Sequence, residues 1–81
     1  MEDAIREIFN GVWKERKGTK PPVLEADSLL LETGLDSLDF AIVVARLEER
    51  VGFDPFSIAD DAYYPQTFGD FVAFYKKYSS M

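Results

Sequence analysis

The 81-residue chain contains no cysteine and no histidine. Without cysteine it can form neither a disulfide bond nor a thiolate metal site, as is usual in a reducing compartment. The common pairs of nucleophile and general base are also absent, because most of them use a histidine. Fifteen acidic residues leave a hydrolase with paired carboxylates formally open, but no apolar cleft for such a pair is visible. We therefore expect neither enzymatic activity nor a metal site.

Basic residues are few, with nine Lys and Arg against fifteen Asp and Glu and a net charge of −6. An acidic surface repels nucleic acids and anionic membranes, so we expect partner proteins with basic surfaces. No apolar run approaches the ~20 residues that span a bilayer. The N-terminus also lacks the basic start and apolar run of a signal peptide. We expect a monomeric cytoplasmic chain whose residues 1–81 form one domain, since a core of this size leaves no room for a second.

The first stretch with helical spacing of apolar residues ends at Gly18, which can adopt the left-handed conformation of a helix end. Trp13 lies on its apolar face and is interpreted as a core residue. In the connection that follows, over residues 18–36, Pro21-Pro22 prevents a helix and five leucines indicate packing onto the domain, with one helical turn after Asp27. Antiparallel helices need only a short connection, so this length predicts a crossing to a parallel neighbour.

The other helices are marked by capping boxes, in which side chains three residues apart bond to each other's backbone amides. This spacing occurs in Asp36–Asp39, Ser57–Asp60 and Thr67–Asp70. It predicts a long second helix that ends at Gly52, a short third helix that reaches Ala62 and a long final helix. The expected fold is all-α: a small four-helix bundle of three long helices and one short one, with a long first loop.

The second helix carries an apolar stripe on the side that we expect to face solvent. At 100° per residue, its core face is formed by Phe40, Val43, Val44, Leu47 and Val51. We interpret the opposite side as a docking strip for partner proteins, with burial under the long loop as the alternative. The predicted docking residues are Leu38, Asp39, Ile42, Ala45, Arg46 and Glu49.

Ser37 lies at the start of this helix, where free backbone amides and the helix dipole favour a phosphate. Because the chain has no histidine to act as its general base, the serine is better suited to be a substrate of an enzyme that brings its own base. A Ser in an Asp-Ser-Leu tripeptide is by itself usually only a helix cap, so the wider context decides.

Residues 34–39, Gly-Leu-Asp-Ser-Leu-Asp, and 47–53, Leu-Glu-Glu-Arg-Val-Gly-Phe, strongly resemble the acyl carrier protein family. The resemblance covers nearly the whole chain. It implies 4′-phosphopantetheine attached to Ser37 through a phosphodiester, with an acyl or aminoacyl group held on its thiol as a thioester. It also implies that Asp36 assists the transfer and that the second helix is the main recognition surface. The implied partners are a phosphopantetheinyl transferase, an acyl- or aminoacyl-activating ligase, and an acyltransferase or condensing enzyme.

Carriers of fatty acid synthesis commonly keep acidic side chains and a bulky apolar residue along the exposed face of the second helix, whereas this chain has Ile42, Ala45 and Arg46 in that region and Arg50 further on. The difference argues against a housekeeping role in fatty acid synthesis. Residues 60–67 look more like those of carriers of specialised pathways, and the starting methionine and the lack of flanking linkers lead us to expect a freestanding chain. Phe40, one turn below Ser37, is expected to fill the interior together with other aromatic residues. A filled interior favours a short, polar or aminoacyl cargo. The competing interpretation is a helical protein-interaction module with the same fold that is never modified.

Overall fold

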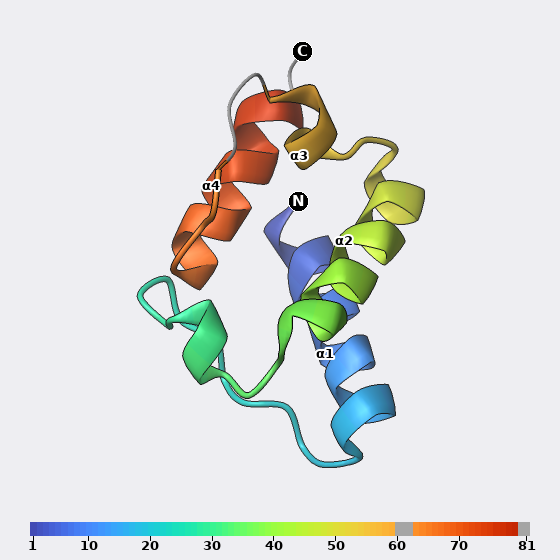
Figure 1. Ribbon diagram of the computed structural model, residues 1–81, viewed down its shortest axis with the longest axis vertical. Coiled ribbons are helices and arrows are strands. Elements are labelled where there is room, and N and C mark those ends of the chain that lie inside the picture. Colours follow the sequence, from blue (N-terminus) through green and yellow to red (C-terminus); the bar gives the residue numbers. More distant parts are fainter. Residues whose placement is uncertain (60–62, 80–81) are drawn as a thin grey trace.

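The computed structural model describes residues 1–59 and 63–79, and the elements in these ranges are helical. The elements are α1 (Glu2–Lys17), the 3-10 helix η1 (Leu30–Glu32), α2 (Ser37–Val51), α3 (Pro55–Ile58) and α4 (Phe68–Ser79). Figure 1 shows α1, α2 and α4 as the long elements, with α3 beside the end of α4. The predicted all-α fold, with three long helices and a short one, is confirmed.

α1 and α2 pack side by side in opposite directions. Arg46 of α2 pairs with Glu15 near the end of α1, whereas Arg50, one turn further along α2, pairs with Glu7 near the start of α1. Sequence numbers therefore rise in one helix as they fall in the other, as the two ribbons in Figure 1 also show. The prediction that the long connection leads to a parallel neighbour is wrong. The long connection runs instead to the start of α4.

The long connection is fastened to the start of α4 by three backbone hydrogen bonds of 2.8–2.9 Å. They run from Leu30 N–H to Gln66 O, from Phe68 N–H to Ser28 O and from Gly69 N–H to Ala26 O. A Cβ atom at Gly69 would lie only 2.8 Å from Ala26 O, so this approach needs a glycine. Leucines of the connection also enter the core, and the helical turn predicted after Asp27 is η1. The segment that leads to Ser37 is thus anchored at both ends.

The helix starts follow the predicted capping boxes in two of three places. Asp36 and Asp39 bond reciprocally at 2.9 and 3.2 Å, and the boxed pair at the start of α4 does the same. The predicted start of the short helix at Ser57 is wrong, because α3 begins at Pro55 and the Asp54 side chain caps it. The fixed φ of proline suits a first helical position, where no N–H is needed. Residues 60–62, into which the predicted helix extends, lie outside the described residues.

The core lies between α1, α2 and α4 and is rich in aromatic side chains. Its fully buried members include Phe9, Val43, Leu47, Phe68 and Tyr75, each at 2% exposure or less. Burial of one such side chain stabilises the fold by ~1.5–3 kcal/mol. The half-buried Trp13, predicted as a core residue, stacks on Phe9 with 6.5 Å between the ring centres. This packing holds the start of α2 in a fixed place relative to α1.

Candidate functional site

Ser37 is the first residue of α2 and is exposed. The turn before it contains Gly34, with φ of 109°, and Leu35, which is buried and ties the turn to the core. Asp36 then supplies the N-cap. Within the described residues the Ser37 hydroxyl makes no hydrogen bond. It is therefore held on a rigid element while remaining free to react.

The start of α2 is also suited to a negatively charged group. The backbone N–H groups of Ser37 and Leu38 have no hydrogen-bond partner in the described part of the chain, while that of Asp39 is taken by the Asp36 side chain. α2 has 15 residues, so partial positive charge accumulates at this end. Free amides at a helix start stabilise phosphate oxygens. The residues present thus fit a phosphate-linked group on Ser37.

Within the described residues, only one of the two carboxylate oxygens of Asp36 accepts a hydrogen bond. Its Oδ1 accepts the hydrogen bond from the Asp39 amide, and Oδ2 has no partner in ranges 1–59 and 63–79. The side chain is exposed next to Ser37. The second carboxylate oxygen of Asp36 is therefore accessible beside Ser37. No group of three or more metal-ligating side chains occurs in these same ranges.

Asp39 is not on the surface, and its predicted place in the docking strip is wrong. Its side chain is 1% exposed. Arg16 Nε donates to Asp39 Oδ1 at 2.6 Å, and Lys17 Nζ lies 3.8 Å from Oδ2. The Arg16 hydrogen bond lowers the pKa of the Asp39 carboxyl and outweighs the desolvation that would raise it. Asp39 therefore joins the start of α2 to the end of α1 and cannot face a partner.

The rest of the predicted docking strip is only partly exposed. Leu38 is 59% exposed, and Ala45 and Glu49 also face solvent. Ile42, by contrast, is half-buried and packs against the core, so its placement on a fully exposed face is wrong. Arg46 is exposed but pairs with Glu15 of α1.

The basic side chains of α2 lie on the side that faces α1. Arg50 pairs with Glu7, and this contact lowers the pKa of the Glu7 carboxyl and raises that of Arg50, first through the hydrogen bond and then through the charge. With Arg46 paired to Glu15 in the same way, both arginines of α2 have their charges balanced by α1. The outward side of α2 is therefore apolar and acidic rather than basic.

An open groove of about 600 Å³ begins at Ser37 and follows α2. Its α2 side is formed by Ser37, Ala41, Val44 and Glu48, which lie three or four residues apart on one helical face. The other lining residues are mostly apolar: Leu30, Leu31, Phe40, Ala45, Asp54, Phe56, Tyr63, Tyr64, Pro65 and Phe71. The sequence interpretation missed this groove, because Tyr63-Tyr64-Pro65 indicates only a helix stop. Exposed aromatic residues next to a proline were the available signal.

Phe40 lies at this groove and not in a sealed interior. Its ring is 6.4 Å from that of Phe9, and the side chain is half-buried. The prediction that aromatic residues fill the core is right for Phe9, Phe68 and Phe71, which are buried. It is wrong for the space beside Phe40, which is open and apolar. The predicted short, polar or aminoacyl cargo is not tested by this geometry.

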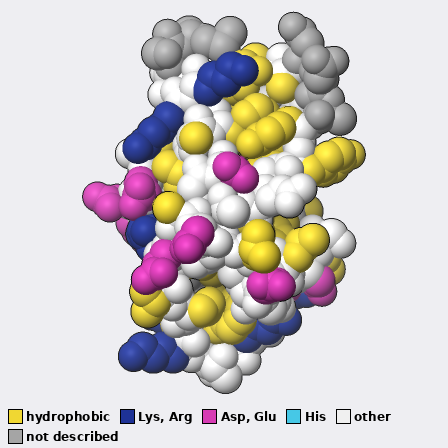
Figure 2. All heavy atoms as spheres, turned by 90° about the vertical axis from the view of Figure 1, so that its left-hand side faces the viewer, with side chains coloured by type: hydrophobic (Ala, Val, Ile, Leu, Met, Phe, Trp, Pro, Cys, Tyr) yellow, Lys and Arg dark blue, Asp and Glu magenta, His cyan; other side chains and the backbone are white. Residues whose placement is uncertain are grey.

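One face of the molecule illustrates its acidic composition. On the face turned toward the viewer in Figure 2, hydrophobic and acidic side chains lie close together, and Lys and Arg lie mostly near the edges. None of the helices in the described ranges has the length and hydropathy of a membrane span.

Comparison with known proteins gives one match. The family model described as "Phosphopantetheine attachment site" matches residues 3–62, which is 60 of the 81 residues. The matched range contains α1, the long connection, α2 with Ser37, and α3. Searches of curated proteins and of solved structures gave no match.

Proposed function

The chain belongs to the phosphopantetheine attachment-site family, and we propose that Ser37 is the residue to which the group is attached. Members of this family bind 4′-phosphopantetheine covalently, so the chain is a carrier protein that works with modifying and biosynthetic enzymes. The observation that carries the proposal is an exposed serine with a free hydroxyl at the first position of α2. The free amides of Ser37 and Leu38 support it, since they suit a phosphodiester at that position.

Ser37 is a substrate in the attachment reaction. Its Oγ forms a bond to the phosphorus of coenzyme A that bears the pantetheine, and the bond from that phosphorus to the oxygen of 3′,5′-ADP breaks. The serine proton passes to a base of the transferase, because this chain has no histidine to take it. The free oxygen of Asp36 is placed to ligate a magnesium ion held by the transferase. Once attached, the group supplies a thiol on which an acyl or aminoacyl cargo is held as a thioester.

The groove beside Ser37 supports a narrower proposal for the cargo. Its walls are mostly apolar, and Glu48 and Asp54 line it along with them. Glu48 lies 11 residues beyond Ser37 on α2, or about 16 Å along the helix axis. A cargo with a carboxylate at its far end would meet like charge there, whereas a neutral or cationic end would not. We therefore propose an acyl or aminoacyl cargo without a carboxylate at its far end, and we keep the proposal of a specialised pathway.

The outward side of α2 is proposed as the docking surface for partner enzymes. Of the predicted docking strip, the residues that face solvent without a partner on α1 are Leu38, Ala45 and Glu49. Leu31 and Tyr64, which are 80% and 82% exposed, continue it on the far side of the groove. Such a surface fits a partner with an apolar patch edged by basic residues.

The proposed attachment is tested by the intact mass of the chain after incubation with coenzyme A and a broad-specificity phosphopantetheinyl transferase. We expect a gain of one phosphopantetheine, and no gain in Ser37→Ala. Ser57→Ala is the matched control, because Ser57 is another exposed helical serine, with its hydroxyl bonded to Asp54 at 3.0 Å. No gain with several transferases would instead support an unmodified protein-interaction module. A gain that persists in Ser37→Ala would place the group on another residue.

A further inference from the structure

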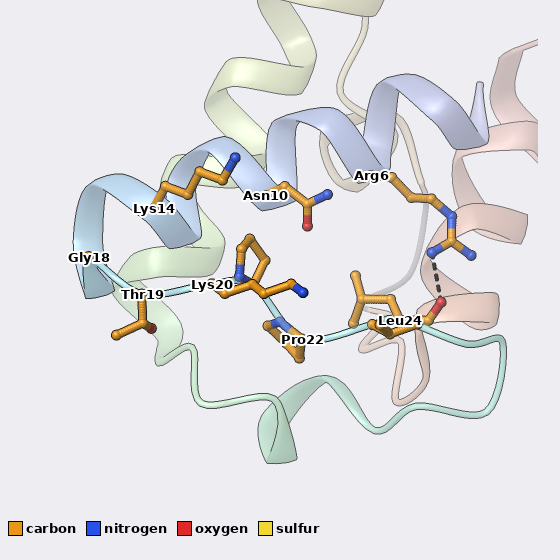
Figure 3. A pocket seen from close by; sticks show the side chains of 10 residues that line it. Arg6, Asn10, Lys14, Gly18, Thr19, Lys20, Pro22 and Leu24 are labelled. Atoms are coloured by element: carbon orange, nitrogen blue, oxygen red, sulfur yellow. Dashed lines mark hydrogen bonds between the residues drawn. The ribbon is translucent and has the colours of Figure 1, made fainter.

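A second hollow, of about 670 Å³, lies between α1 and the chain from Gly18 to Leu24. Figure 3 shows Arg6, Asn10 and Lys14 along its α1 side, four residues apart, and Lys20 on the opposite side. It shares no lining residue with the Ser37 groove. Nothing in the carrier function proposed above uses it.

The α1 side of the hollow is held in place by Arg6. Its Nη1 donates to Leu24 O at 2.6 Å, the bond drawn in Figure 3, and its guanidinium carbon lies 4.7 Å from the centre of the Phe68 ring. Its Nε also bonds to Glu2 at 3.2 Å. Arg6 is thus largely committed within the fold. It connects the two walls of the hollow, so other residues have to supply the groups that bind a ligand.

Three other polar side chains around the hollow are uncommitted. Lys14 and Lys20 are exposed and form no ion pair with any residue in ranges 1–59 and 63–79, and the amide of Asn10 makes no hydrogen bond there. Two ammonium groups and one amide therefore surround an accessible space. This set suits a ligand with carboxylates and peptide groups.

The hollow is a local exception to the charge of the molecule. Among the described residues, its lining includes Arg6, Lys14 and Lys20 and no acidic residue, a net charge of +3, so the rest of the chain sums to −6 − 3 = −9. A long polyanion or an anionic membrane would meet mostly repulsion from the rest of the chain. A short ligand with few negative charges would meet mainly this basic lining.

The length of the hollow indicates an extended ligand. Arg6 and Lys14, at the two ends of its α1 wall, are eight residues apart, which is about 12 Å along α1, so a single small anion fills only part of the hollow. An extended peptide rises ~3.3 Å per residue, and four residues cover that length. From these observations we infer that the hollow binds a short acidic segment of a partner protein in an extended conformation. Its carboxylates lie against Lys14 and Lys20, and a peptide group of its backbone bonds to Asn10.

The inference is tested with the ¹⁵N-labelled chain and an acetylated, amidated octapeptide in which glutamate and alanine alternate. At low salt we expect saturable shifts at the backbone amides of residues 10, 14, 18–20, 23 and 24, since Pro21 and Pro22 have no N–H. The charge-reversal variant Lys14→Glu/Lys20→Glu should weaken binding roughly tenfold, as two lost ion pairs replaced by repulsion imply. The matched control is Lys76→Glu/Lys77→Glu, which changes the net charge equally on α4 and should bind as the wild type does. All four lysines are exposed, so both variants should keep the native spectrum.

Three results would overturn the inference: no saturable shifts, an equal loss of binding in the control variant, or tighter binding of an eight-nucleotide oligodeoxythymidine at the same residues. The last would make the ligand a nucleic acid. The titration is run on the unmodified chain and on the chain treated with transferase, with the same result expected in both. Failure to modify Ser37 would therefore not affect the peptide titration, and failure of the peptide to bind would not affect the test of attachment at Ser37.

Discussion

Replacement of Gly34 by alanine should destabilise the chain by about 2–5 kcal/mol. The φ of 109° at Gly34 costs an L-residue roughly 1–2 kcal/mol. A Cβ atom there would also lie 2.9 Å from Trp13 Cη2 and 3.3 Å from Cζ3. Overpacking of this kind costs about 1–3 kcal/mol more. The ring cannot easily retreat, because it stacks on Phe9 and its Nε1 donates to Thr19.

Two further Gly→Ala variants separate the free-energy cost of a positive φ from the cost of the Cβ contact with Trp13. Gly18 has φ of 71° with nothing within 4 Å of a Cβ, so its variant should lose only about 1–2 kcal/mol. Gly11 lies inside α1 with the same open space, so its variant should gain about 0.5–1 kcal/mol. Urea unfolding, followed by the fluorescence of Trp13 as the single tryptophan, measures all three. If the Gly34 and Gly18 variants unfolded at the same urea concentration, the packing of Trp13 under the turn before Ser37 would be refuted.

Three other perturbations have defined outcomes. Tyr75→Phe should raise the free energy of unfolding by about 1 kcal/mol, because it removes the hydroxyl that is buried without a partner in the described residues; a loss of stability in urea unfolding would show that the hydroxyl is bonded. The pKa of Asp39 in the folded state lies below its ordinary value of 3.8. The stability that the ionised carboxylate contributes is therefore fully present above pH 3.8 and is lost as the pH falls through the lower, folded-state pKa. Urea midpoints at about pH 6 and about pH 2.5 should therefore differ less in Asp39→Asn than in the wild type, and an equal difference would contradict the Arg16–Asp39 pairing. When the transferase loads the chain from butyryl- or succinyl-coenzyme A, the butyryl form should show larger NMR shifts of the amides of residues 41–48 than the succinyl form. Glu48→Gln should reduce this difference between the two forms. Equal shifts in both forms would contradict selection of the cargo by charge.

The parts of the fold that could be predicted from sequence are those set by neighbours in the chain. Gly18 ends α1 and Asp36 caps α2 because the deciding hydrogen bonds join residues three or four positions apart. The start of α3 is also set by neighbours in the chain, but the capping-box spacing at Ser57 pointed to the wrong residue. Pro55 forbids continuation of a helix, but it is equally suited to begin one after a capping Asp54.

The site residues that were placed wrongly depend on contacts between distant segments. Asp39 has the spacing of a surface residue, and its burial results from Arg16, which is 23 positions earlier. Ile42 and Arg46 follow the helical period of an exposed side, yet they lie at its edge, where Ile42 packs against the core and Arg46 pairs with Glu15 of α1. The apolar groove and the basic hollow likewise form only when loops fold back along α2 and α1. A helical period gives relative angles around one helix, and it does not give the direction from which the next helix approaches.

Fragment-ion mass spectrometry of the transferase-treated chain locates the phosphopantetheine group directly. Trypsin should release residues 18–46 as one peptide that contains both Ser28 and Ser37, since it does not cleave between Lys20 and Pro21. We predict that N-terminal fragments ending at or before Asp36 keep their unmodified masses and that all longer ones carry the group. The added mass on fragments that end before Ser37, or no modified peptide with any transferase, would contradict attachment at Ser37.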